Sequence, residues 1–172
     1  MPTSNTLSQG RSRKHPVTAN ADKILQDKPL NDPRTNNPKI AAMSSDFSTA
    51  FLAAWQTSDR VAMRASVKKL IAAAADSGCA ELIFVAKRDG SHVLYSSPAV
   101  ITVLSPLPPG AVLEISRLLF ANASFRSRPR FQANRNCSAR IAVASKTTPE
   151  AEIYSAPNLN GERYCHLRFP SA

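Results

Sequence analysis

The spacing of apolar residues predicts two adjacent helices in the first half of the chain. Aromatic residues recur at helical intervals from Phe47 to Trp55, directly after side chains at 44–46 that suit a helix N-cap. Asp59 gives a second cap signal, and strong helix formers follow it as far as Gly78, a typical C-terminal stop. We therefore expect a helical pair at this point of the chain.

Apolar runs bounded by turn residues predict an antiparallel sheet in the rest of the chain. The turn pair 89–90 separates the run 82–85 from the run 92–95, and a third strand is expected over 99–104. Prolines then interrupt the pattern, and residues 111–120 return to helical spacing. Four more short strands are expected, over residues 123–132, 138–145, 150–155 and 162–169.

These elements define the fold class that the sequence predicts. It is α+β, with an N-terminal helical pair, an antiparallel sheet of short strands and one further helix. A β-sandwich of the jelly-roll type is the alternative if the helical assignment fails.

The first 40 residues differ from the remainder in composition. They contain five prolines and no Phe, Trp or Tyr. Such a segment buries too little apolar surface to offset the roughly 1–2 kcal/mol per residue that ordering a backbone costs. We expect residues 1–40 to form a disordered basic arm and residues 41–172 to form a single globular domain.

Charge is the most informative feature of the composition. Lys and Arg total 22, Asp and Glu total 12, and the formal net charge is +10. The excess lies in the arm and in residues 115–172, whereas residues 41–114 are neutral overall. A charge of this size indicates a polyanionic partner, with nucleic acid first and an anionic membrane surface second.

A stretch without acidic residues runs from 115 to 149 and includes three alternating arginines. In a strand, Arg126, Arg128 and Arg130 would project from one face about 6–7 Å apart, close to the spacing of phosphates along a nucleic-acid strand. Pro129 favours an edge position, because proline cannot donate to a strand ladder. The competing interpretation is a solvated basic edge that blocks unwanted strand pairing.

A second basic pattern lies on the second predicted helix. Arg60, Arg64 and Lys68 recur every fourth residue and so share one face, which either contacts phosphates or is an ordinary solvated face. The candidate nucleic-acid-binding residues are the basic side chains of the arm, this helix and the acid-free stretch: Arg11, Arg13, Lys14, Arg60, Arg64, Lys68, Arg126, Arg128, Arg130 and Arg135.

No motif for catalysis, cofactor binding or metal binding is evident. Cys165 and His166 are adjacent, so a strand would direct them to opposite faces, and His92 lies in a predicted hairpin. The five glycines form no phosphate-binding loop, and the three cysteines have no metal-site spacing. We therefore expect that the protein is not an enzyme and has no catalytic residue. We also expect that it binds neither a cofactor nor a metal. No apolar run is long enough for a membrane span, and no secretory signal is evident.

The overall organisation resembles that of a viral protein family. An aromatic-free arm bearing Arg11, Arg13 and Lys14 precedes a body with short strands such as 140–144 and 164–169. This arrangement is similar to the coat proteins of small positive-strand RNA plant viruses, although helix over residues 46–76 departs from a pure jelly roll. The resemblance implies an arm that neutralises packaged RNA, a body that self-associates, and a location in the virion or the host cytoplasm.

The sequence therefore predicts a structural protein that binds nucleic acid, RNA rather than DNA, and self-associates. Phosphate neutralisation would make binding weakly sequence-specific and strongly salt-dependent. Two alternatives stay open. One is a small RNA-binding regulator, such as a viral silencing suppressor. The other is a protein-interaction module or effector whose positive charge faces an acidic partner.

Overall fold

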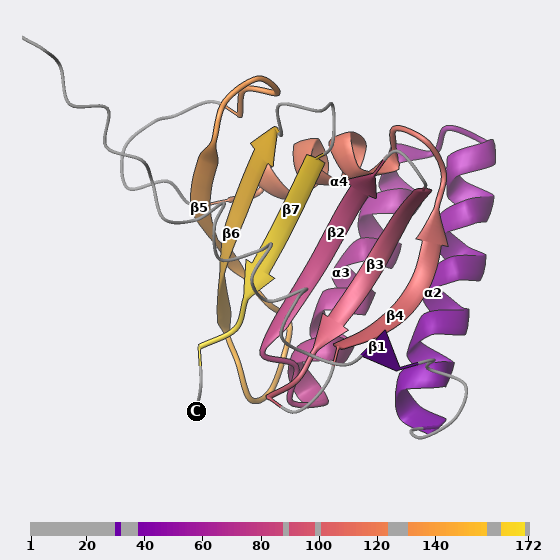
Figure 1. Ribbon diagram of the computed structural model, residues 1–172, viewed down its shortest axis with the longest axis vertical. Coiled ribbons are helices and arrows are strands. Elements are labelled where there is room, and N and C mark those ends of the chain that lie inside the picture. Colours follow the sequence, from indigo (N-terminus) through magenta and orange to yellow (C-terminus); the bar gives the residue numbers. More distant parts are fainter. Residues whose placement is uncertain are drawn as a thin grey trace, which may run out of the picture.

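A computed structural model describes residues 30–31, 38–87, 90–98, 101–123, 131–157 and 163–170 of the chain. Three helices and seven strands lie within these residues (Figure 1). In chain order they are β1 Leu30–Asn31, α2 Pro38–Gln56, α3 Arg60–Asp76, β2 Glu81–Lys87, β3 Gly90–Ser96, β4 Ile101–Leu107, α4 Ala111–Phe120, β5 Cys137–Ala142, β6 Glu150–Pro157 and β7 Arg163–Arg168.

The strands form one sheet in the order β1-β4-β3-β2-β7-β6-β5. The six longer strands are antiparallel, and β1 adds a short parallel pairing to β4. Strands β2–β4 and β5–β7 are two meanders, which α4 connects and which meet where β2 pairs with β7. Phe84 lies opposite Cys165 at this junction, so the centre of the sheet comes from distant parts of the sequence.

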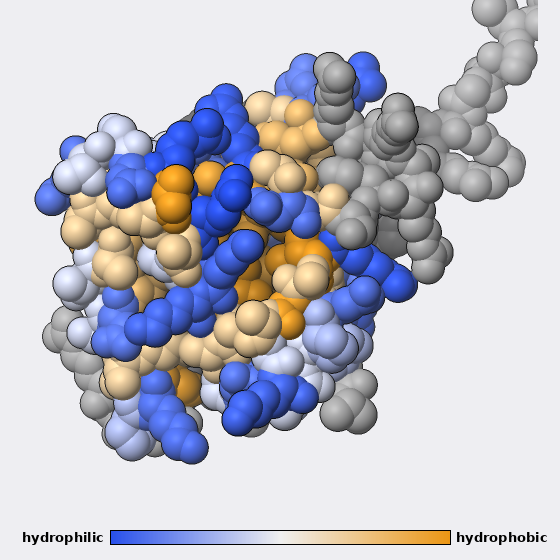
Figure 2. All heavy atoms as spheres, turned by 180° about the vertical axis from the view of Figure 1, so that it is seen from behind, coloured by the Kyte–Doolittle hydropathy of each residue, from blue (hydrophilic) through white to orange (hydrophobic). Residues whose placement is uncertain are grey.

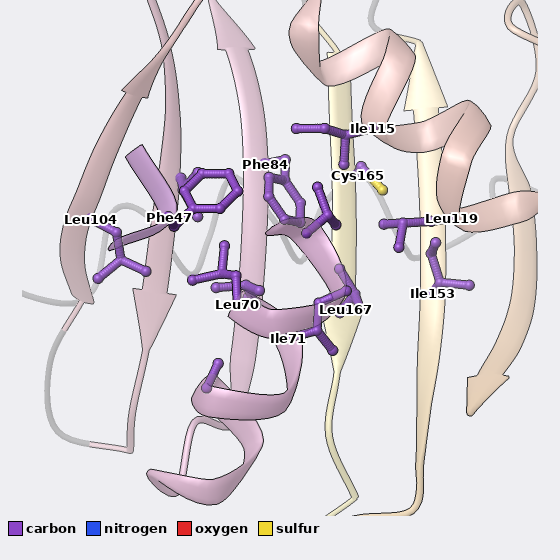
Figure 3. Close-up of a cluster of buried hydrophobic side chains, with 14 of the residues drawn as sticks. Phe47, Leu70, Ile71, Phe84, Leu104, Ile115, Leu119, Ile153, Cys165 and Leu167 are labelled. Atoms are coloured by element: carbon purple, nitrogen blue, oxygen red, sulfur yellow. The ribbon is translucent and has the colours of Figure 1, made fainter. Parts of the chain in front are cut away.

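All three helices lie on one face of the sheet, and the main core fills the space between the two layers (Figure 1). Side chains alternate along β2, so that Leu82 and Phe84 face the helices and are fully buried. Leu70 of α3 and Ile115 of α4 reach the same core (Figure 3). A smaller cluster that includes Ile83 lies on the opposite face.

The helical pair begins earlier than the capping pattern predicts. α2 starts at Pro38, where proline suits the first helical turn, so the predicted cap at 44–46 is wrong. Ser44 is buried inside α2, and its hydroxyl donates to the backbone carbonyl of Leu104 in β4. The side chain therefore joins α2 to the sheet instead of capping a helix. The cap at Asp59 is confirmed, because its carboxylate accepts the first backbone N–H groups of α3.

The predicted α+β class is confirmed, and the jelly-roll alternative is not needed. The predicted arm over residues 1–40 is corrected at two places, because residues 30–31 form β1 and residues 38–40 begin α2. The other residues of the predicted arm lie outside the described residues. Most of the strand predicted over 123–132 lies outside the described residues; its described positions 123, 131 and 132 are not in a strand, and Phe131 stacks on Phe120 at a centroid distance of 5.1 Å. None of the described helices has the length and apolarity that crossing a membrane requires.

Candidate binding groove

A groove of about 440 Å³ opens on the helical side of the protein. It lies between the middle of α3, the last turn of α4 and the end of β5 with the two residues that follow. Viewed from that side, the surface is hollowed near its middle, where hydrophobic residues are exposed beside hydrophilic ones (Figure 2). We refer to this feature as the α3–β5 groove.

One face of α3 forms the first wall of the groove. Arg64, Val67, Lys68 and Ile71 line it, and their spacing of three and four residues places them on one side of the helix. Val67 and Ile71 are 1% and 3% exposed, whereas the two basic side chains are exposed. The wall thus has an aliphatic base and a basic rim.

The end of β5 forms the facing wall. Ile141 and Val143 are buried against the core, and the Val143 N–H donates to the Pro149 carbonyl over 2.8 Å, which closes the hairpin between β5 and β6. The hairpin turn is held to the end of α3, where the Ser145 hydroxyl donates to the Asp76 carboxylate over 2.6 Å. This long-range bond keeps β5 beside α3 and so fixes the shape of the groove.

The last turn of α4 contributes Leu118 and Leu119, and the turn that follows it contributes Asn122. The Asn122 side-chain amide donates to the Leu118 carbonyl at the end of α4 over 2.8 Å, so this polar group already has a hydrogen-bond partner. Among the described lining residues none is aromatic and none is acidic. The groove therefore offers aliphatic contact area together with positive charge.

The two basic side chains at the rim differ from their neighbours in their ionic partners. Arg60 Nε lies 2.8 Å from Glu114 Oε1, and Arg117 Nη1 lies 3.5 Å from Glu114 Oε2. In the part of the chain that the structure describes, neither Arg64 nor Lys68 has a carboxylate within ion-pair distance. Two uncompensated positive charges, one helical turn apart, therefore border an aliphatic surface.

The predicted basic face of α3 forms, but its three members have different surroundings. Arg64 and Lys68 line the groove, and Arg60 is paired with Glu114. Arg135 is exposed in the loop before β5 and does not line the groove. Six further candidates lie outside the described residues: Arg11, Arg13, Lys14, Arg126, Arg128 and Arg130.

Among the described residues, the titratable side chains outside the groove do not gather into a second site. Cys165 is buried in the core, whereas His166 points to the other face, 3.6 Å from Glu81, so the prediction that they face apart is confirmed. Burial raises the pKa of the Cys79 and Cys165 thiols to about 12. Within the described residues no three potential metal ligands come together.

Sequence reasoning identified the basic rim but missed the groove. Val67 and Ile71 alternate with Arg64 and Lys68 along the sequence, and this pattern could have indicated the groove. An entirely solvated helix face does not carry large apolar residues. The facing wall lies about seventy residues away in the chain, as the Ser145–Asp76 bond indicates, and no local pattern encodes that contact.

Comparison with known proteins assigns no role to these residues. No protein family and no curated protein matches the chain.

Proposed function

We propose that the protein is an interaction module whose α3–β5 groove binds a segment of a partner protein rich in aliphatic and acidic residues. The observation that carries the proposal is the pair Arg64 and Lys68, which border an aliphatic groove and have no carboxylate partner among the described residues. The proposal corresponds to the alternative named above, in which the positive charge of the chain faces an acidic partner protein.

The aliphatic base supports affinity for apolar side chains. Val67 and Ile71 on one wall face Ile141 and Val143 on the other, with Leu119 between them on α4. Removing a valine or leucine side chain from water contributes roughly 1.5–3 kcal/mol when burial is complete. Two such side chains from a partner would supply roughly 3–6 kcal/mol toward the cost of association, so the segment must also make further contacts along the groove.

The basic rim supports selectivity for negative charge. Both rim side chains are solvent-exposed, so each ion pair with a partner contributes only about 0–1 kcal/mol. Charges in this position mainly raise the association rate and reject partners of the same sign. We therefore expect the groove to discriminate between acidic and basic segments of equal hydrophobicity.

The groove itself gives less support to RNA. Proteins that bind single-stranded nucleic acid without sequence preference stack bases on aromatic side chains, and the described lining of this groove is aliphatic. RNA binding through the other candidate residues stays a prediction, as does the similarity to coat proteins. The experiment that tests the groove also tests RNA binding.

The experiment measures fluorescence anisotropy of a labelled short peptide in which valine and glutamate alternate. Its control peptide replaces each glutamate with lysine. The protein is compared with the double variant Arg64→Ser/Lys68→Ser and with the matched variant Lys87→Ser/Arg168→Ser, which removes the same charge from exposed positions outside the groove. A labelled single-stranded RNA and a duplex RNA complete the set.

We expect the acidic peptide to bind and the lysine peptide to fail. The groove variant should weaken binding about 2–30-fold, the sum of two exposed ion pairs, while the matched variant leaves it unchanged. Equal weakening by both double variants would contradict a site at the groove. RNA that binds tightly and displaces the peptide would favour the nucleic-acid interpretation instead.

A further inference from the structure

We infer that residues 17–29 of this chain bind the second face of the sheet, the face opposite the three described helices. These residues lie outside the described part of the chain. The inference goes beyond the proposed function, because the α3–β5 groove lies on the helical side and not on this face. It follows from the burial of the second face, from the place of β1 in the sheet and from the composition of the segment before β1.

The second face carries an apolar cluster that is almost completely buried. Each member is at most 8% exposed, and the members are Ile83, Val85, Leu94, Ile101 and Tyr164. The three described helices do not cover them, because they pack on the other face of the sheet (Figure 1). A sheet face in contact with water keeps its side chains partly accessible. Further atoms must therefore cover the cluster.

The position of Ile101 shows that neighbouring strands alone do not account for this burial. β4 is the outermost long strand on its side of the sheet, and its outer edge pairs with the two residues of β1. Ile101 is nevertheless fully buried. Side chains of adjacent strands flank a residue on its own face but do not shield it from above. The burial of Ile101 therefore requires a segment that lies over the sheet.

The covered part of the face is the half of the sheet next to β1. The described members of the cluster come from β2, β3, β4 and β7, and none of them comes from β5 or β6. Toward the far edge of the same face, the side chains of Arg140 and Glu152 remain 49% and 43% exposed. We therefore expect the covering segment to reach the face from the β1 side.

The chain before β1 enters the sheet at this edge. Leu30 lies beside Ile101 in the pairing of β1 with β4. Adjacent strands are about 4.7–4.9 Å apart, so β1 and β2 are separated by about 14 Å. An extended chain advances about 3.3 Å per residue, so the step from Leu25 to Leu30 spans up to about 17 Å. Ile24 and Leu25 are thus close enough along the chain to reach Leu94.

The shorter segments outside the described residues suit this face less well. Residues 32–37 lead to α2 and residues 124–130 follow α4, and both helices lie on the other face. The segments 88–89 and 99–100 have two residues each, too few to cover a cluster drawn from four strands. Residues 158–162 join β6 to β7, away from β4. The chain before β1 is therefore the occupant that length and connectivity favour.

Residues 17–29 also have a composition that an apolar face accepts. They contain Val17, Ile24 and Leu25, and their two acidic residues balance their two basic residues. Residues 1–16 differ, because they contain three basic residues and no acid. The inference therefore places a neutral segment with apolar side chains on the sheet and leaves the positive charge of residues 1–16 beyond it.

The test is a methyl NOE measurement on the full-length protein with labelled isoleucine, leucine and valine methyl groups. We expect cross-peaks that join Leu25 to Leu94 and Ile101. The variant Leu25→Ser measures the contribution to stability, and Leu7→Ser is the matched control, because it removes the same side chain from residues 1–16. Thermal unfolding and binding of a hydrophobic dye are compared for the wild type and both variants, and light scattering gives the oligomeric state.

Leu25→Ser should lower the melting temperature by about 4–10 °C and raise the dye fluorescence, whereas Leu7→Ser should change neither. Absence of cross-peaks from Leu25 to the cluster, with Leu25→Ser as stable as the wild type, would overturn the inference. A wild-type dimer with intermolecular cross-peaks between two copies of the cluster would assign the cover to a second copy and overturn it as well. Neither result bears on the groove, which the variants of Arg64 and Lys68 test separately.

Discussion

The Arg60 guanidinium and the Glu114 carboxylate lie 2.8 Å apart and join the first turn of α3 to α4. Glu114 also lies 3.5 Å from Arg117, so one carboxylate serves two arginines. Among the described basic residues of α3 and α4, Arg64 and Lys68 are therefore the two without an ionic partner, and both lie beside the groove. Glu114 limits the electrostatic attraction of the groove for an acidic partner.

Glu114→Gln should strengthen binding of the acidic peptide about two- to fivefold, because it releases Arg60 and Arg117. Exposed ion pairs contribute about 0–1 kcal/mol each, so thermal stability should change little. Anisotropy titration and thermal unfolding measure the two effects. Asp46→Asn is the matched control, since Asp46 pairs with Lys69 outside the groove. An equal gain in both variants would assign the effect to net charge alone.

The Asp59 cap makes a separate prediction about stability. Its carboxylate accepts hydrogen bonds from the Val61 and Ala62 N–H groups, both at 3.0 Å. Asp59→Ala should lower the free energy of unfolding by about 0.5–2 kcal/mol, whereas Asp59→Asn keeps an acceptor and should be nearly neutral. Urea denaturation measures both. An equally large loss in the two variants would mean that the charge, and not the acceptor, stabilises α3.

The three cysteines should react with iodoacetamide at very different rates. Cys137 is partly exposed, whereas Cys79 and Cys165 are buried, and burial raises the pKa of each buried thiol to about 12. Because the thiolate is the nucleophile, one thiol should be modified quickly at pH 8 and two only on unfolding. Mass spectrometry follows the reaction, and Cys137→Ser should remove the fast phase. Rapid labelling of Cys165 would contradict its placement in the core.

The raised pKa of Cys165 also predicts how stability depends on pH. An unfolded thiol has a pKa near 9, so the folded state holds its proton to higher pH than the unfolded state does. The stability from this difference is fully present below pH 9 and is lost as the pH rises toward 12. The stability difference between wild type and Cys165→Ala should narrow by about 2 kcal/mol between pH 9 and 10.5. A constant difference would mean that the thiol is not protected.

Local periodicity predicted most of the fold because the helices and strands have apolar faces that the sequence displays directly. The aromatic spacing in α2 and the apolar runs that form β2 and β3 are examples of patterns that need no tertiary information. The start of α2 was predicted too late because Ser44, a residue type that commonly caps helices, lies inside this helix. Its hydroxyl instead donates to the carbonyl of Leu104, sixty positions away, and the sequence pattern does not show that bond.

The candidate site was predictable only in part. The spacing of Arg60, Arg64 and Lys68 established that they share a helix face, yet Glu114 pairs with only the first of them. That difference depends on how α4 packs against α3, which local patterns do not specify. The groove similarly depends on the bond that holds Ser145 to Asp76. Long-range contacts thus decided which basic residues can serve a partner.

The most direct test of the central claim is an NMR titration of isotopically labelled protein with the alternating valine–glutamate peptide. The account predicts that amide shifts concentrate at the groove, on Val67, Ile71, Ala142 and Ala144, while Val85 on the opposite face of the sheet stays unchanged. Shifts confined to Arg135 and other basic residues outside the groove, or spread evenly over the basic surface, would contradict it.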